Sequence, residues 1–286
     1  MSLSTVLFLF LAHLGVGILF TLVFVSREAG VKFFRFNAGL AAILIAIALA
    51  FRFGALGPAA SSAYSGYPAA PAPGVPIPGN QIADLALGCA EAALVLYWAT
   101  VGRSLARIRP AIVAVAVTSG LVAIVIQALD VSSGQSPAVE ALTIASFVTS
   151  ALMLGGACTA MILGHWYLVI PSLQVSHLQS IVRVHIASML ARIAVVAAAV
   201  WLAMATTNTG LGPSFRHYIM SVDGIFFWQR VLFGLAGPAV LSYLTRETAK
   251  IRSTQSATGI LYVDFFTVIV GEVLAKYIVL ATHVAV

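Results

Sequence analysis

Charge is the property this 286-residue chain has least of, with 15 basic and 9 acidic side chains. Charged residues form 8% of the sequence, against about 25% in a typical soluble domain. Hydrophobic residues form 61%. This composition excludes an ordinary soluble domain, whose surface needs many more charges.

Motifs for several kinds of chemistry are also missing. The two cysteines, Cys89 and Cys158, lie in apolar runs and predict small buried side chains rather than a disulfide or a metal pair. The sequence has no glycine-rich phosphate loop, no Cys-x-x-Cys and no His-Glu-x-x-His. The first apolar run lacks a basic leader and a cleavage site, so we expect it to remain as a helix.

Long apolar runs are abundant, and each is long enough to cross a membrane. About 20 residues at 1.5 Å each span the hydrocarbon layer. The runs predict an all-α integral membrane protein of eight transmembrane helices, at about 4–26, 35–52, 82–102, 110–129, 140–168, 184–205, 222–245 and 257–283.

The basic residues lie mostly in alternate gaps between these runs. Ten of them fall after the first, third, fifth and seventh runs, at Arg27, Lys32, Arg35, Arg103, Arg107, Arg109, Arg183, Arg246, Lys250 and Arg252. The positive-inside rule makes these gaps cytoplasmic and places both termini outside. We therefore expect a multi-pass protein of a bacterial-type inner membrane with lipid around it, and we do not expect it to bind nucleic acid.

Two halves are distinguishable along the chain. Residues 1–134 form one four-helix unit, with a long outer loop at 53–81 rich in proline, and residues 135–286 form the second. Basic pairs recur before corresponding helices, as in Arg107-Ile108-Arg109 and Lys250-Ile251-Arg252. This spacing indicates two bundles related by a parallel internal repeat, or a chance likeness between basic loops.

Five ionisable residues fall inside the runs at overlapping depths in the outer half. They are His13, Glu91, Arg230, Glu272 and Lys276. Such residues are costly in a membrane and usually face the protein interior or a cavity. Glu272 and Lys276 share a helix face and are able to pair, and Arg230 and Glu91 are able to neutralise each other. The group predicts either structural ion pairs or a pocket for a polar head group whose protons leave to the outside.

A second set lies toward the inner face. Asp264 and Arg192 predict a secondary inner-side proton path, and His165 and His185 lie at the inner ends of their helices. A bis-histidine haem b needs two histidines at one depth on facing helices. His165 and His185 are candidates for this, but a single boundary histidine is more often structural. No metal site is otherwise expected.

The last run carries a family-like motif. Gly271-Glu272-Val273-Leu274-Ala275-Lys276 resembles the Gly-Glu-x-x-(small)-Arg pattern of the NrfD/DmsC/PsrC membrane anchors, with Lys in place of Arg. Eight helices with both termini outside also resemble that family. The resemblance implies a quinone-reactive subunit of a respiratory oxidoreductase complex, with quinol bound near the outer side and iron–sulfur or cytochrome subunits as partners.

The sequence therefore supports three functions. In the first, an electron-transfer subunit that is not catalytic alone binds quinone through His13 and Glu91, while Arg230, Glu272 and Lys276 set the local field and route protons. The second is a proton-coupled transporter or permease. The third is a structural or assembly subunit of a membrane supercomplex.

Overall fold

Eight helices long and apolar enough to cross a membrane make up most of the described chain. The computed structural model describes residues 3–54, 81–103, 106–170, 174–205 and 215–286. The spans are α1 (Leu3–Leu22), α2 (Gly30–Arg52), α4 (Gln81–Thr100), α5 (Arg109–Val131), α6 (Pro137–Val169), α7 (Val175–Ala205), the composite of α9 (Ile225–Val231), η3 (Leu232–Ala236) and α10 (Gly237–Lys250), and α11 (Thr254–Thr282). The predicted all-α multi-pass membrane fold is confirmed.

Local sequence signals set several helix ends. Pro110 lies in the first turn of α5, where its missing N–H removes no helical hydrogen bond. Ser136 caps α6 by accepting from the Val139 amide, and Pro137 follows it. Gly134, with φ of 79°, forms the turn before that cap. The α5–α6 connection is therefore short, and the two helices pack against each other.

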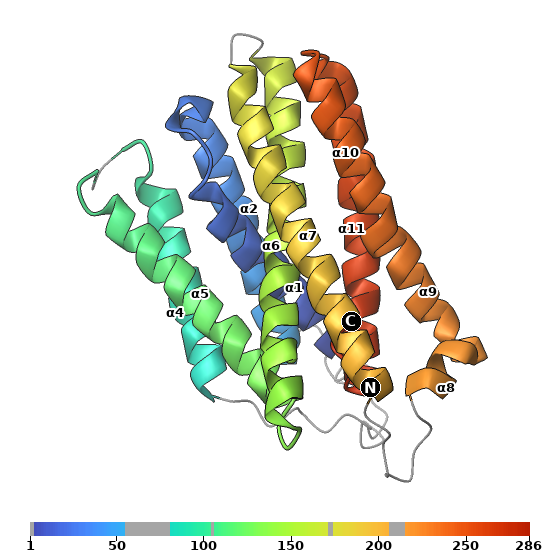
Figure 1. Cartoon of the computed structure of the whole chain (residues 1–286). Helices are drawn as coiled ribbons and strands as arrows, with labels where there is room; N and C mark the ends of the chain where they lie inside the picture. The colour runs from blue at the N-terminus through green and yellow to red at the C-terminus, as the bar shows by residue number, and fades with distance from the viewer. Residues whose placement is uncertain (1–2, 55–80, 104–105, 171–173, 206–214) are drawn as a thin grey trace, which may run out of the picture.

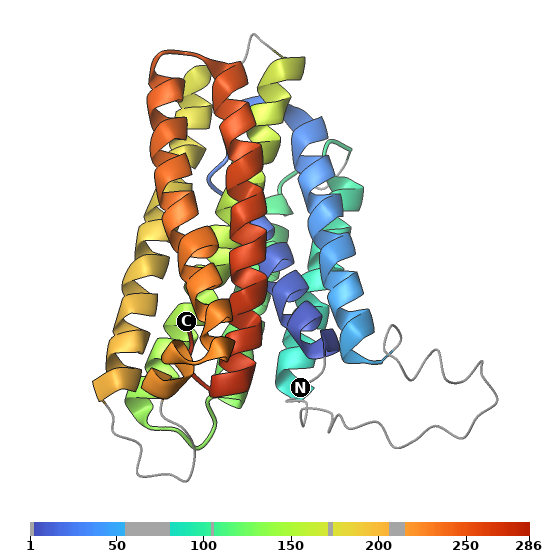
Figure 2. The ribbon, with the colours of Figure 1, turned by 90° about the vertical axis from the view of Figure 1, so that its right-hand side faces the viewer.

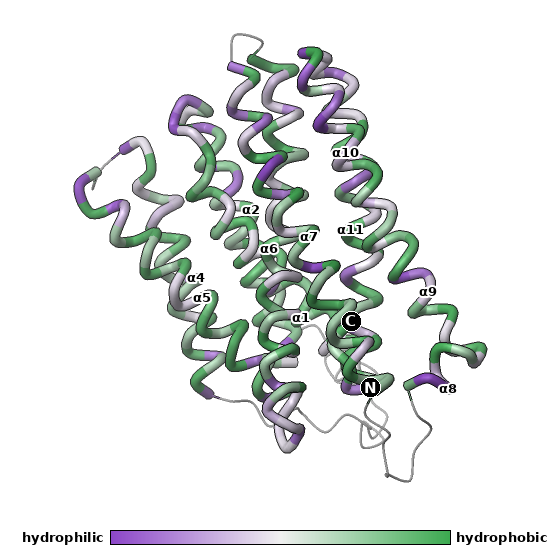
Figure 3. Tube along the Cα trace, in the orientation of Figure 1, coloured by the Kyte–Doolittle hydropathy of each residue, from purple (hydrophilic) through white to green (hydrophobic). Residues whose placement is uncertain are grey.

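The helices run side by side, and α1 begins where α11 ends (Figures 1 and 2). We call this the termini end. The opposite end carries the loops with Arg27, Arg107 and Lys250, and we call it the basic end. Figure 3 shows hydrophobic residues along the middle of the helices and hydrophilic ones gathered near the basic end. The side of the membrane that each end faces stays a prediction.

Helices α1 and α6 form the centre of the bundle and touch through small residues. A β-carbon added to Gly17 would collide with the Ala151 carbonyl, and one added to Gly155 would collide with the Gly17 backbone. Beside this contact the Thr21 and Thr159 hydroxyls lie 2.7 Å apart. In lipid the hydrophobic effect does not favour helix association, so membrane helices associate largely through close packing. Small residues allow their backbones to approach closely.

The predicted units meet at this central contact. Helix α1 of residues 1–134 packs on both α2 and α6, while α4 and α5 form a hairpin at the edge of the bundle (Figure 1). The internal repeat stays a prediction. Of the predicted outer loop at 53–81, residues 55–80 lie outside the described part of the chain.

The seventh span is irregular at its middle. Leu232–Ala236 form a π-helical turn directly before Gly237-Pro238. Proline has no N–H to give to the carbonyl four residues earlier, so regular α-helix is interrupted there. Gly234 in this turn packs on Gly271 of α11 so closely that a β-carbon on either would overlap the other's backbone. π-Turns often occur at functional sites, and this one begins two residues after Arg230.

Candidate functional site

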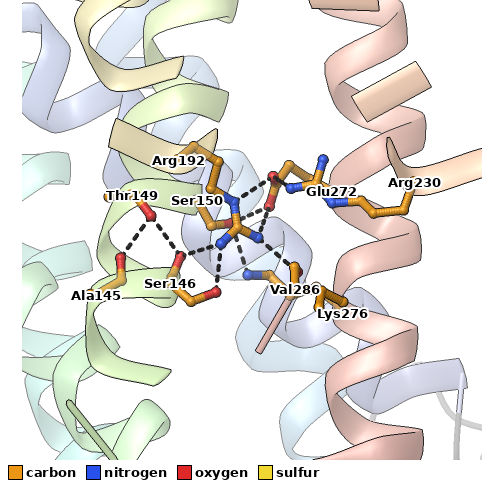
Figure 4. Close-up of polar contacts among 9 residues, drawn as sticks. All are labelled: Ala145, Ser146, Thr149, Ser150, Arg192, Arg230, Glu272, Lys276 and Val286. Carbon is orange, nitrogen blue, oxygen red and sulfur yellow. Dashed lines mark hydrogen bonds and ion pairs between the residues drawn. The ribbon is translucent and has the colours of Figure 1, made fainter. Parts of the chain in front are cut away.

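Glu272 is the centre of a buried polar network between four helices (Figure 4). It projects from α11, and three side chains from other helices bind its carboxylate. Arg192 of α7 donates from Nε to Oε1 at 3.0 Å, and Arg230 of α9 donates from Nη2 to the same oxygen at 2.7 Å. Ser150 of α6 donates to Oε2 at 2.5 Å. One carboxylate thus holds α6, α7, α9 and α11 together.

Arg192 is the most extensively bonded member. Its Nη1 donates to the Ser146 hydroxyl at 2.5 Å and to the Ser146 carbonyl at 3.1 Å. Its Nη2 donates to Oε2 of Glu272 at 3.4 Å and to the main-chain oxygen of Val286 at 3.0 Å. Every nitrogen of this guanidinium therefore has an acceptor, which fixes its orientation.

Lys276 joins the network through a hydroxyl rather than by direct pairing. Its Nζ donates to Ser150 Oγ at 2.8 Å and lies 4.7 Å from the centre of the Phe147 ring. Among the described residues, no ion pair within 4.0 Å joins Lys276 to Glu272. The predicted Glu272–Lys276 pair is therefore wrong in detail, because Ser150 stands between the two charges and bonds to both.

The network carries more positive than negative charge. Arg192, Arg230, Glu272 and Lys276 are each 1% exposed or less. Three basic side chains therefore surround one buried carboxylate. Arg230 also has two nitrogens, Nε and Nη1, with no hydrogen-bond partner in the described part of the chain. The site therefore has hydrogen-bond donors that no described residue uses. Burying such donors without partners costs free energy.

His13 lies beside the network on α1. Its ring meets Phe147 edge to face at 4.9 Å, so Phe147 contacts both His13 and Lys276. Neither ring nitrogen of His13 has a hydrogen-bond partner, although the residue is fully buried. Gln127 of α5 is the polar side chain that interacts with this ring, although among the described residues the two side chains do not meet full hydrogen-bond geometry. Buried polar groups without protein partners usually bind water or a ligand.

Glu91 lies apart from the other four residues predicted with it. It is half-buried on α4, which packs on α2 and α5. Its Oε2 is buried without a partner. The predicted neutralisation of Arg230 by Glu91 is wrong, because Arg230 binds Glu272 instead. Similar depth in the membrane did not imply proximity here, since α4 is at the edge of the bundle.

A second buried pair lies nearer the basic end. Nε2 of His185 on α7 is 2.7 Å from Oδ2 of Asp264 on α11, and both side chains are fully buried. Asp264 lies eight residues before Glu272, about 12 Å along the helix. Arg192, predicted to lie with Asp264 on an inner path, belongs to the Glu272 network. Its five hydrogen bonds reach Ser146 of α6, Glu272 of α11 and Val286, so Arg192 belongs to that network rather than beside Asp264. The inner-side proton path stays a prediction.

The two histidines suggested as haem ligands have different partners. His165 is exposed and its Nδ1 is 3.0 Å from the Tyr262 hydroxyl, whereas His185 binds Asp264. The haem suggestion stays a prediction. Within the described ranges, no group of three His, Cys, Asp or Glu side chains is placed to hold a metal ion.

A cavity of about 470 Å³ opens at the termini end next to the network. Its walls come from α6, α7, α8 (Phe215–Met220) and the last residues of the chain: Gln135, Val139, Leu142, Thr143, Ala199, Leu202, Ala203, Phe215, Tyr218, Ala281, Thr282, His283, Val284 and Ala285. Thr143 lies one turn from Ser146, and Ala285 precedes Val286. Both Ser146 and Val286 bind Arg192, so the cavity ends close to the network.

Reasoning from sequence missed the neutral members of the site. Ser146 and Ser150 are spaced by four on an apolar helix, which places both hydroxyls on one face. That spacing is the signal available in the sequence. Phe147 and Gln127 carry no such signal, because single aromatic and amide residues are common in packed helices.

No protein-family model matches the chain, and no curated protein matches it. The resemblance to the NrfD/DmsC/PsrC anchors therefore stays a prediction, and the functional argument depends on the residues themselves.

Proposed function

We propose that this multi-pass protein is a quinone-binding subunit of a membrane electron-transfer complex in a bacterial-type inner membrane, with its termini end outside. The head group of the quinone or quinol lies at the Glu272 network in the outer half of the membrane. Iron–sulfur or cytochrome subunits supply or accept the electrons. The chain alone carries no redox reaction in this proposal.

The observation that carries the proposal is the cavity beside a buried, donor-rich network: Thr143 and Ala285 of the cavity wall are close in the chain to Ser146 and Val286, which accept from Arg192. A quinone head group is apolar with two carbonyl oxygens, so it needs an apolar cavity and a few donors. Leu142, Ala199 and Phe215 supply apolar wall, and Thr143 lies one turn from the Arg192 contacts. This is the usual composition of a small-molecule site.

Proton handling fits the same residues. Quinol oxidation releases protons, and a carboxylate or an imidazole within reach of the head group is able to accept them. Glu272 is tied to two arginines, while His13 has both ring nitrogens unpartnered. We therefore assign His13 as a neutral imidazole that accepts a hydrogen bond from the quinol hydroxyl, and Glu272 as the residue that positions Arg192 and Arg230.

Photolabelling with an azidoquinone in native membranes tests this proposal. We expect label in α6 and in residues 254–286, and we expect decylubiquinone to compete for it. Lys276→Met should reduce the label about tenfold, because a charge-assisted donor near the head group is lost.

The matched control is Lys250→Gln at the exposed basic end, where Lys250 pairs with Glu247 at 2.6 Å. Its labelling should equal that of the unaltered protein. Label confined to the α4–α5 hairpin, or label that decylubiquinone does not displace, would show the site assignment to be wrong. Co-purification in mild detergent with a visible spectrum checks the redox partners and the haem.

A second candidate is proton-coupled transport, and one observation favours it. The His185–Asp264 pair and the Glu272 network lie at two depths between α7 and α11, as expected of relay groups along a path. Uptake of a solute into liposomes that contain the isolated chain, driven by a pH gradient, would support this candidate over the first.

A further inference from the structure

The Glu272 network is a strongly unbalanced set of charges. Arg192, Arg230 and Lys276 face a single acidic side chain, and the nearest described carboxylate along α11, Asp264, is bound by His185. When all four network residues are ionised, two positive charges have no acidic side-chain partner among the described residues, and the main-chain oxygen of Val286 is the further acceptor that Arg192 has. An excess of this size among buried side chains is stable when another negative or acceptor group shares the site.

Unused donors point to the same conclusion. Nε and Nη1 of Arg230 bind nothing in the described part of the chain, and Nη1 lies against the backbone of Gly234 and Gly271. Lys276 Nζ has one hydroxyl acceptor, Ser150, and an aromatic face. An ammonium has three donors and a guanidinium has five, so both have unused capacity.

The main-chain oxygen of Val286 is an acceptor for Arg192 within the network. His283 adopts a left-handed conformation with φ of 57°, which ends α11 and turns the following residues into the bundle. Ala285 and Val286 are buried there. The main-chain oxygen of Val286 accepts from Arg192 Nη2 at 3.0 Å. Residues 281–285 line the cavity and Val286 follows them, so this segment connects the cavity wall to the network.

We propose that the network is an anion site, and that it binds an amphipathic molecule whose single negative charge is spread over oxygen atoms. The apolar part lies in the cavity of about 470 Å³, and the charged oxygen replaces that of Val286 on Arg192. A quinone head group in an anionic form and a fatty carboxylate share this chemistry. The quinone case rests on the function proposed above, and the carboxylate case does not.

Two quinones that differ in charge provide the test. One is 2-hydroxy-3-decyl-1,4-naphthoquinone, whose acidic hydroxyl is ionised at neutral pH. The other is its neutral 2-methyl analogue, and decanoate and decanol form a second charged and neutral pair. Equilibrium binding to the purified full chain in detergent should favour each anion over its neutral analogue by about tenfold or more.

Variants then assign the preference to the network. Lys276→Gln and Arg230→Gln should each reduce the preference for the anion about tenfold, while Lys250→Gln should leave it unchanged. Ala203→Phe adds bulk to the cavity wall and leaves the charges in place. It should weaken all four ligands, which keeps the proposal testable when a charge variant fails to fold.

The outcomes separate this inference from the proposed function. Binding of decanoate without either quinone supports the anion site and contradicts the quinone function. Equal binding of the charged and neutral quinones supports the quinone function and overturns the anion site. An anion preference that survives both Lys276→Gln and Arg230→Gln also overturns it, because the charge would then act from elsewhere.

Discussion

At the scale of single residues, Glu272 is the counter-charge that offsets the cost of burying Arg192 and Arg230. Arg192 and Arg230 both bind its Oε1, and Ser150 bonds its Oε2. A buried ion pair adds little net stability compared with apolar packing, but removal of one partner leaves the other charge stranded. The stability of this protein should therefore depend more on Glu272 than on either arginine alone.

Glu272→Gln removes that negative charge while keeping the size of the side chain. We expect it to lower the free energy of unfolding by about 3–5 kcal/mol, because Arg192 and Arg230 would remain buried without a counter-charge. Thermal or denaturant unfolding in detergent measures this loss.

Glu247→Gln is the matched control, since Glu247 forms an exposed pair with Lys250. Exposed pairs contribute about 0–1 kcal/mol. Equal stability changes in the two variants would contradict the central role of Glu272.

At the scale of helices, contacts between glycines set the spacing. Gly17 and Gly155 bring α1 and α6 together, and Gly234 and Gly271 bring the π-helical turn against α11. The second contact sets where Arg230 enters the network, because Nη1 of Arg230 lies against both glycines. The π-turn and the proline that follows it thus belong to the geometry of the site.

Gly155→Leu tests the central contact. A side chain at this position would overlap the Gly17 backbone, so α1 and α6 must separate. We expect a loss of about 1–3 kcal/mol or more, as in other overpacked cores. Thermal unfolding in detergent is the measurement.

Gly259→Leu provides the comparison. Gly259 lies on the exposed face of α11 with open space around its α-carbon. Its replacement should leave stability within about 0.5 kcal/mol. A Gly155→Leu protein as stable as Gly259→Leu would show that the two helices tolerate wider spacing.

At the scale of the whole molecule, the two ends of the bundle differ in charge. The basic end carries most of the loop cations, while the termini end carries the cavity. Positive charge in short loops favours retention on the cytoplasmic side. The site therefore opens toward the outer side in the proposed orientation, which is where quinol protons would be released.

Cysteine labelling in whole cells tests this orientation. Ser133→Cys puts a thiol in the exposed α5–α6 turn at the termini end, and Arg107→Cys puts one at the basic end. A membrane-impermeant maleimide should label Ser133→Cys in intact cells and Arg107→Cys after permeabilisation. The unaltered protein is the control for its native Cys89 and Cys158. The reverse pattern would overturn the proposed orientation.

Much of the architecture was predictable because apolar length reports directly on membrane crossing. The predicted ranges match the eight spans, with ends that differ by a few residues for most helices and by nine at the start of α7, which extends past its apolar run to Val175. The site was predictable in part. Arg230, Glu272 and Lys276 lie together, while Glu91 lies elsewhere and Arg192 joins from the other set. Depth follows from residue number, but lateral position does not.

The sequence by itself determined that the helices are able to cross a membrane, how many do so, and the depth of each ionisable residue along its helix. These properties follow from local hydrophobicity and the rise of a helix. The tertiary structure decided which residues at one depth meet. Glycine contacts and the π-turn bring Arg230 to Glu272, where Arg192 also binds. The inward turn at His283 brings the main-chain oxygen of Val286 to Arg192. Lateral packing depends on all the helices at once, so no single segment encodes it.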